Sequence, residues 1–461
     1  MEQKFVYTSG RNFLKTGEKI SFNGIGLGSW LNMEHFMMGI PGTDKQIRRT
    51  FEMVYGKEVA ESFFDDFTYD FIGEEDFKFL KEYDINLVRV PINYRLFIDD
   101  KTGERKEKGY EYLRYLLDLG SKFQIYILPD LHTTPGGQNP DWHSDNGTGY
   151  TEFWEYYSFR KEICELWKDI ATELKDEEYL LGYDILNEPF IVPELIEASQ
   201  SSEDMATGLS VDSAKGELYD FTRQVIAAIR EADKRHIIFI EGDHFASDFE
   251  AFNDIKDDQM AMEFHFYPTV WYPDLYSDSY SRSERYDIFE KVLCKLIDAA
   301  GKSGHPVLCG EAGYEIKTNG FERTLPLIED TIALFKKHDV SFTLWSYKDA
   351  GFMGMAYPKK DTLWMKLSRD AQERWDHHSE LGEAERLTDE LCDKLYPEAK
   401  KEERYVLTFR LRALMYPLEE KYVLAPLLVK YGKESLKELA ESFAFRNCDY
   451  YKEFAELFKM R

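Results

Sequence analysis

The 461-residue sequence predicts an α/β protein, a closed (β/α)8 TIM barrel with loop insertions and a C-terminal helical appendix. From about residue 20 to residue 350, short apolar runs typical of buried strands alternate with amphipathic stretches typical of helices. Such alternation predicts a parallel sheet with helices packed on it. There are eight runs, and eight strand–helix units favour closure into a barrel.

The expected strands are short and rich in apolar residues. They cover residues 22–27, 86–90, 124–128, 181–186, 237–240, 260–266, 306–309 and 341–344. The expected helices lie between them, at residues 74–83, 111–122, 153–174, 217–232, 286–300 and 323–337. In the second of these helices, Leu113, Leu116, Leu117 and Gly120 recur at the three-to-four spacing of a packed helix face.

Two longer segments interrupt the alternation. Residues 33–70 follow the first run and residues 191–214 follow the fourth. Both leave the carboxyl end of a strand, which is the face where barrel loops build binding sites. After about residue 360 the pattern becomes helical and highly charged. We therefore expect a catalytic barrel over residues 1–359 and a helical extension over residues 360–461.

Composition excludes some classes of partner. With 86 acidic and 58 basic residues the net charge is −28, which argues against nucleic acid and anionic membranes, because phosphate binding needs an excess of Lys and Arg. No stretch approaches the roughly 18–20 apolar residues of a membrane span.

The five cysteines are odd in number and show no CxxC spacing, and no signal-like segment opens the chain. We expect a cytoplasmic protein, although a removed signal peptide would leave the same picture.

Two glutamates occupy equivalent positions after different strands. Glu188 follows Asn187 at the end of the fourth run, and Glu311 follows Gly310 at the end of the seventh. The carboxyl ends of barrel strands meet at one face, and a pair of carboxylates there is what glycoside hydrolysis requires. Asn187 could bind the sugar 2-hydroxyl, and Gly310 would allow the backbone to approach the substrate closely. An acid in this pair is expected to have a raised pKa.

Polar or aromatic residues stand in or at the end of other runs. Arg89 would pair with Glu311 and keep it ionised; a purely structural salt bridge is equally compatible. Tyr267 could hydrogen-bond Glu311, and His265 could tune Glu188.

His132 ends the third run and Trp345 the eighth. Trp345 is expected to lie under the sugar ring, and a core role is its rival. The separation of His132, His143 and His265 gives no metal signature, so neither a metal nor another cofactor is expected.

The segments LVRVP, LH, LNEP, HFY, GEAG and LW, in this order, resemble glycoside hydrolase family 5 over roughly residues 20–350. The resemblance implies a barrel with catalytic glutamates on strands four and seven. It further implies a retaining mechanism with Glu311 as nucleophile and Glu188 as acid/base.

Within that family, the N-terminal half most resembles exo-β-1,3-glucanases. The segment GLGSWLNMEHF implies that Glu34 binds hydroxyls of the terminal sugar. The loop LHTTPGGQNPDWHSDNG implies that Asp145 and Asn146 lie near the same sugar. The chain departs from the pattern in a longer loop, in Ser29 where a glycine is usual, and in the Ala-Gly pair after Glu311.

The expected function is the hydrolysis of β-linked glucosides or gluco-oligosaccharides by a retaining, exo-acting enzyme with a double-displacement mechanism. An endo-β-1,4-glucanase or related hemicellulase on the same scaffold is the alternative. A transglycosylase would share every residue. A non-catalytic carbohydrate-binding protein is a third possibility, against which the presence of both Glu188 and Glu311 argues. The sequence makes no prediction of the oligomeric state.

Overall fold

The computed structural model describes residues 4–191, 211–252, 254–277 and 279–459. Within them, eight parallel strands close into a barrel, and each strand pairs with the next along the chain. The strands are β4 (Asn23–Gly26), β5 (Leu87–Asn93), β6 (Tyr126–Thr133), β7 (Gly182–Asp184), β8 (Ile237–Glu241), β9 (Met260–Phe266), β10 (Val307–Ala312) and β11 (Ser341–Leu344). The predicted (β/α)8 barrel is therefore confirmed.

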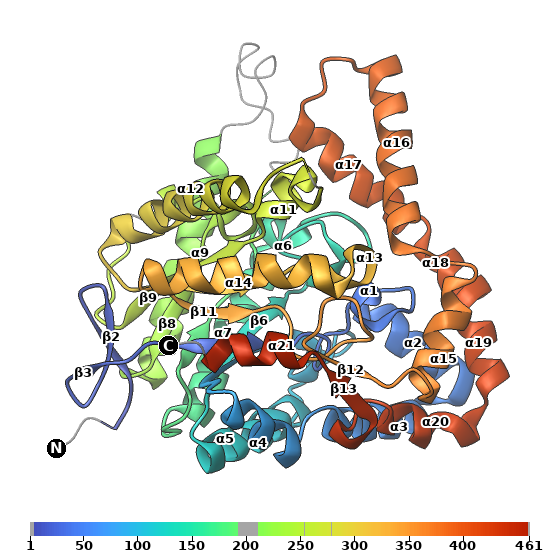
Figure 1. Cartoon of the computed structure of the whole chain (residues 1–461), viewed down its shortest axis with the longest axis horizontal. Helices are drawn as coiled ribbons and strands as arrows, with labels where there is room; N and C mark the ends of the chain where they lie inside the picture. The colour runs from blue at the N-terminus through green and yellow to red at the C-terminus, as the bar shows by residue number, and fades with distance from the viewer. Residues whose placement is uncertain (1–3, 192–210, 253, 278, 460–461) are drawn as a thin grey trace.

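Helices surround the barrel (Figure 1). Those that follow the expected pattern are α4 (Glu74–Glu82), α5 (Lys108–Phe123), α7 (Tyr157–Leu174), α9 (Val211–Ala232), α12 (Arg282–Ala300) and α14 (Phe321–Lys337). The apolar face predicted for α5 is buried. A side chain at Gly120 would come within 2.7 Å of the carbonyl oxygen of Ile125, so this glycine allows α5 to pack closely on the barrel.

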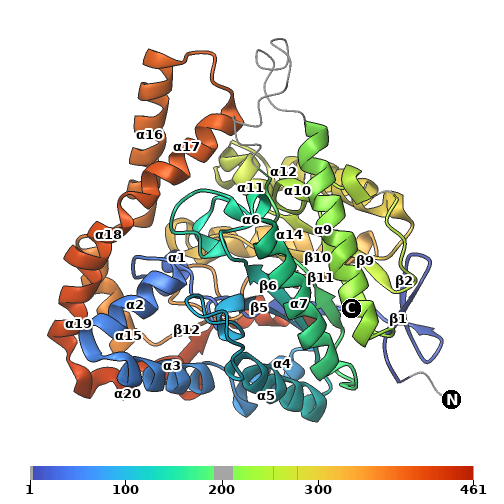
Figure 2. The ribbon, with the colours of Figure 1, turned by 180° about the vertical axis from the view of Figure 1, so that it is seen from behind.

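A small antiparallel sheet closes the amino-terminal end of the barrel. It consists of β1 (Tyr7–Ser9), β2 (Asn12–Lys15) and β3 (Glu18–Lys19). Phe13 of β2 packs edge-on against Phe22 at 5.5 Å between ring centroids, and both belong to one apolar cluster with Leu87 and Phe239 from the barrel strands. In Figures 1 and 2 this sheet lies at the far side of the molecule from α16 and α17.

The first insertion forms α1 (His35–Met38), α2 (Asp44–Tyr55) and α3 (Lys57–Phe71). Of the second insertion, residues 192–210 lie outside the described residues.

The C-terminal part is mainly helical, as expected. It contains α15 (Leu363–Gln372), α16 (His377–Leu395), α17 (Lys401–Ala413), α18 (Tyr416–Glu419), α19 (Ala425–Tyr431), α20 (Leu436–Glu441) and α21 (Lys452–Glu456). Helices α16 and α17 stand out as a hairpin (Figure 1). None of the helices in the described residues combines the length and apolarity needed to cross a lipid bilayer.

A buried lysine joins the barrel to the C-terminal part. Lys348, just beyond β11, is wholly buried. Its Nζ donates to Oδ1 of Asp76 at 2.7 Å, to the carbonyl of Phe71 at 2.6 Å and to the carbonyl of Phe443 at 2.9 Å. These partners come from α4, α3 and the segment after α20, so one ammonium group connects the first insertion and the extension. A buried cation persists only when it is paired in this way.

Replacing Lys348 should destabilise the whole molecule. Lys348→Met leaves the Asp76 carboxylate buried without its cation, and we expect a loss of roughly 3–5 kcal/mol in the free energy of unfolding. The same change at the exposed Lys360 should stay within about 0.5 kcal/mol. Urea unfolding of both variants measures the difference. Equal midpoints would show that the buried ion pair does not hold the parts together.

Candidate active site

Glu188 and Glu311 meet at the carboxyl end of the barrel. One carboxylate oxygen of each, together with a ring nitrogen of His265, lie within 4.8 Å of one another. Glu311 is part of β10, and Glu188 follows β7 by four residues. Their side chains are 7% and 12% exposed. Two nearly buried carboxylates therefore face one small space from different strands.

Arg89 of β5 holds the base of this site. Its guanidinium is fully buried and makes ion pairs at 3.2 Å or less with five carboxylates of the described residues. These are Asp130, Asp184, Glu241, Glu263 and Glu311. Burial raises the pKa of Asp130, Asp184, Glu241 and Glu263, which the positive charge of Arg89 only partly offsets. Burial therefore disfavours a full negative charge on every member of the cluster.

The expected contacts to Glu311 are present. Nη1 of Arg89 donates to its Oε1 at 2.7 Å, and the hydroxyl of Tyr267 donates to its Oε2 at 2.8 Å. Burial and the neighbouring Glu311 raise the pKa of Tyr267 well above its usual range, so the phenol keeps the proton that it donates. Both oxygens of Glu311 are thus held by donors, which fixes the orientation of the carboxylate.

Glu188 is held in an uncommon backbone conformation, with φ at +45°. Its N–H donates to Oε2 of Glu241 at 2.7 Å, and its carbonyl accepts from Nδ2 of Asn139 at 2.9 Å. A non-glycine residue with positive φ costs about 1–2 kcal/mol, and such strain persists only where surrounding contacts impose it. Glu241 and Asn139 are those contacts.

Two histidines flank the carboxylate of Glu188. Nδ1 of His265 lies 2.6 Å from Oε1, and Nε2 of His143 lies 3.0 Å from Oε2. Burial opposes ionisation of Glu188, but His265 and His143 outweigh it and hold its pKa well below the usual range. Burial likewise opposes the charge on His143, while Asp141 and Glu188 raise its pKa well above the usual range. The expectation of a raised pKa for Glu188 is therefore wrong for the free protein, because His265 and His143 lower this pKa.

Asn187 presents an unused donor beside Glu188. Its Oδ1 accepts from Nη2 of Arg89 at 3.0 Å. Among the described residues, its buried Nδ2 has no hydrogen-bond partner. A buried donor without a partner is costly unless a ligand satisfies it, so Nδ2 is well placed for a substrate hydroxyl.

Glu34, His132 and Trp345 form an adjoining wall. Nε2 of His132 lies 3.9 Å from Oε1 of Glu34, and the rings of His132 and Trp345 are stacked at 5.7 Å. Burial raises the pKa of Glu34 well above its usual range. Trp345 is only 4% exposed, and a side chain at Gly26 would come within 2.6 Å of its ring. The glycine in β4 thus makes room for an indole that is mostly packed, and its contact with sugar stays a prediction.

Asp145 and Asn146 support their own loop. Asp145 accepts from Nδ2 of Asn93 and from the N–H of Lys45, both at 2.9 Å. Asn146 donates to the carbonyl of Asn139 at 2.8 Å and accepts from the N–H groups that follow it. Their polar atoms are already engaged, so the geometry favours an effect on the sugar through the shape of the loop.

The comparisons with known proteins agree with this geometry. Residues 54–351 match the model of the cellulase family, glycosyl hydrolase family 5. The chain belongs to glycosyl hydrolase family 5. A β-xylosidase from Phanerodontia chrysosporium is 32% identical over 471 residues, covering 94% of this chain and 93% of the relative.

Other curated relatives and a solved structure are less similar to this chain. An endoglucanase C from Acetivibrio thermocellus is 25% identical, covering 61% of this chain and 85% of its own. A glucan 1,3-β-glucosidase from Schizosaccharomyces pombe is 26% identical, covering 36% and 39%. The solved structure of AoRut superposes with a TM-score of 0.55 at 16% identity over 72% of this chain and 89% of that one, which supports the fold alone.

In this family 5 chain, the absence of a side chain at Gly310 leaves room for a neighbouring carboxylate. A side chain there would come within 1.6 Å of Oε1 of Glu263. That Gly310 also brings the backbone close to the sugar stays a prediction. The glycine leaves space for Glu263, which the charge cluster around Arg89 requires.

Three aromatic residues beside Glu188, here called the aromatic wall, are Phe190, Phe245 and Tyr405. The rings of Phe190 and Phe245 stack at 5.0 Å, and Phe245 lies 6.0 Å from Tyr405. Phe245 lies in α10 (Asp243–Ala246), where three consecutive residues have positive φ, and its ring is 6.1 Å from that of His143. Tyr405 comes from α17, so the C-terminal extension borders the side of the site on which Glu188 lies.

Sequence reasoning missed Glu241, Glu263 and Tyr405, and saw His143 only as a metal candidate. Glu241 had a usable signal, because it is the first polar residue after the fifth apolar run. Glu263 stands inside an apolar run and pairs with Leu308 of β10, while its side chain fills the space beside Gly310; that arrangement depends on the strand register. Tyr405 had no signal, because its place depends on how α17 packs over the barrel.

Proposed function

We propose that this family 5 glycoside hydrolase is a retaining, exo-acting enzyme for β-linked glucosides or gluco-oligosaccharides. The observation that supports the retaining mechanism best is the short distance between Glu188 and Glu311. One carboxylate oxygen of Glu188 lies within 4.8 Å of one carboxylate oxygen of Glu311. Retaining enzymes place the two carboxyl groups about 5–5.5 Å apart, whereas inverting enzymes separate them by about 6.5–9.5 Å to admit a water.

Glu311 is the proposed nucleophile. Its carboxylate attacks the anomeric carbon while Glu188 gives a proton to the departing oxygen, and a glycosyl ester forms on Glu311. Water then attacks the same carbon, Glu188 takes the proton of that water, and the bond to Glu311 breaks. Arg89 and Tyr267 orient the nucleophile in both steps. Nδ2 of Asn187 is available for a sugar hydroxyl next to the reacting carbon.

The acid proton is shared by Glu188 and His143. In the free protein the proton favours His143, which then pairs as a cation with the carboxylate of Glu188 at 3.0 Å. Such strongly interacting groups titrate as a pair. The acid therefore stays available until the pair loses its last proton, and that loss follows the raised pKa of His143.

Exo action is supported by the two unlike sides of the site. Buried Glu34 and His132, with the 142–150 loop held by Asp145, border the proposed glycone side. The aromatic wall borders the side of Glu188, from which the leaving group departs. The similarity to a β-xylosidase and to a glucan 1,3-β-glucosidase supports release of terminal sugars, whereas the similarity to endoglucanase C keeps the endo alternative in the test.

Removing the proposed acid/base should affect substrates unequally. Glu188→Ala should lower kcat/KM for glycosides with poor leaving groups by about 10²–10⁴-fold and spare activated aryl glycosides in the first step. Azide should restore turnover of the activated substrates and give a β-glycosyl azide, since a small anion can take the place of the assisted water. Equal losses on both substrate classes, without rescue, would remove Glu188 from this role.

Replacing His143 should narrow the pH range of activity. In the wild type the last proton of the pair is lost only at the raised pKa of His143, whereas in His143→Gln it is lost at the lower pKa of Glu188 alone. The alkaline limb of the kcat/KM profile should therefore move to lower pH. His244→Gln is a suitable comparison, because His244 is exposed in α10. An unchanged alkaline limb in His143→Gln would contradict proton sharing.

Product order distinguishes exo from endo action. A gluco-oligosaccharide labelled at its reducing end should lose single sugars stepwise from the other end, and a matching xylo-oligosaccharide tests the sugar preference. Glu34→Ala should raise KM and lower kcat together, because the terminal sugar loses a hydrogen-bond partner in both ground and transition states. Glu52→Ala, an exposed change on α2, should leave both unchanged. Mid-chain products in the first minutes would favour the endo alternative.

A further inference from the structure

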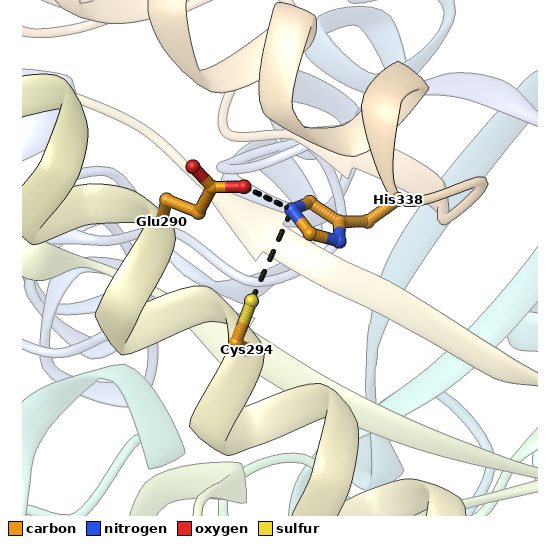
Figure 3. Close-up of side chains that lie close together, drawn as sticks. All are labelled: Glu290, Cys294 and His338. Atoms are coloured by element: carbon orange, nitrogen blue, oxygen red, sulfur yellow. Dashed lines mark hydrogen bonds and ion pairs between the residues drawn. The ribbon is translucent and has the colours of Figure 1, made fainter.

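A second group of chemically reactive side chains lies on the outside of the barrel. Figure 3 shows Glu290 and Cys294 projecting from α12 toward His338. Nε2 of His338 lies 2.7 Å from Oε1 of Glu290 and 3.9 Å from Sγ of Cys294. One oxygen, one nitrogen and one sulfur atom thus lie within 4.8 Å of one another, and none of these residues belongs to the active site.

The fold brings the three residues together from two helices. Glu290 and Cys294 are four residues apart, so they lie one above the other on the same face of α12. His338 is the C-cap residue that directly follows α14. Both helices belong to the outer layer of the barrel and run next to each other in Figure 1.

We propose that Glu290, Cys294 and His338 bind a zinc ion, with water as the fourth ligand. Thiolate, imidazole and carboxylate are zinc ligands, whereas calcium and magnesium prefer oxygen alone. Zinc bonds of about 2.0–2.3 Å arranged as a tetrahedron place ligand atoms about 3.3–3.6 Å apart. The observed contacts of 2.7 and 3.9 Å bracket that separation, so the first must widen by about 0.6 Å and the second must shorten by about 0.3 Å to complete the site.

Protons and charges balance on binding. Cys294 releases its thiol proton to water, and His338 binds through the lone pair of Nε2 while Nδ1 keeps the ring proton. The thiolate and the Glu290 carboxylate then neutralise the two positive charges of the ion.

The exposure of the ligands decides whether an ion can reach the site, and a neighbouring lysine competes with the ion for one ligand atom. The side chains of Glu290 and His338 are 25% and 26% exposed, so an ion can enter from solvent and keep a water ligand. Nζ of Lys337 lies 2.7 Å from Oε1 of Glu290 and competes with the metal for that oxygen. Lys337 is half exposed, and an exposed ion pair of this kind is worth little, so the lysine can give way.

Zinc at this site would connect α12 to the end of α14. These helices precede and follow β10, the strand that carries Glu311. Binding of an ion to the folded chain alone stabilises it by mass action. The expected consequence is a higher thermal midpoint in the presence of zinc, independent of the glycosidase chemistry.

Cobalt(II) gives a direct test, because a thiolate–cobalt bond has its own charge-transfer absorption. The metal-free full-length chain, titrated with cobalt(II), should develop this band and lose it when zinc is added in competition. Cys294→Ser should abolish the band, and His338→Gln should weaken cobalt binding at least tenfold. Cys164→Ser, which removes a half-buried cysteine of α7, should keep the band.

A variant and its matched control complete the test. Lys337→Ala removes the competing cation and should tighten zinc binding several-fold, whereas Lys295→Ala, an exposed change next to Cys294, should change it much less. Zinc should raise the thermal midpoint of the wild type but not of Cys294→Ser. Absence of the band in the wild type, its persistence in Cys294→Ser, or equal affinities in the two lysine variants would overturn the proposal.

Discussion

Pairing of the buried Arg89 guanidinium is the constraint on which the catalytic end of the barrel depends. Five consecutive strands, β6 to β10, each supply one carboxylate to it: Asp130, Asp184, Glu241, Glu263 and Glu311. A buried charge is tolerated only when it is paired, and a slip of one residue in any strand would turn its carboxylate out of the barrel. The cluster thereby links strand register to the position of Glu311. Through Glu241 it reaches the backbone of Glu188 as well.

The two glutamates receive different surroundings from this arrangement. Glu311 lies between the Arg89 cation and the Tyr267 phenol, and both donors fix the orientation of its carboxylate. Glu188 lies between the rings of His265 and His143, and we propose that it shares a proton with His143. The rest of the molecule adds boundaries to this centre. The packed Trp345 and the loop of Asp145 border one side, and Tyr405 of the C-terminal helices borders the other, so the extension contributes to the site as well as to the fold.

Local sequence pattern was sufficient for the barrel, because eight apolar runs and their helices recur in order. It also placed Glu188, Glu311, Arg89 and Tyr267 correctly relative to one another, since strand ends in a barrel converge. It was insufficient where a position depends on register or on distant packing. The side chain of Glu263 in β9 fills the space beside Gly310 in the neighbouring strand β10. Tyr405 reaches the site from a helix more than 200 residues beyond Glu188. The pKa direction of Glu188 also required the position of His143, which the sequence alone does not give.

The central claim is that Glu311 forms a covalent bond to the sugar during turnover. An activated 2-fluoro β-glucoside forms the glycosyl ester but slows its hydrolysis, so the intermediate accumulates. Peptide mapping by mass spectrometry of the labelled chain then locates the sugar. The account predicts one label per chain, on Glu311, together with loss of activity that recovers as the ester hydrolyses. A label on any other residue, or an inverted anomeric product from the normal substrate, would contradict it.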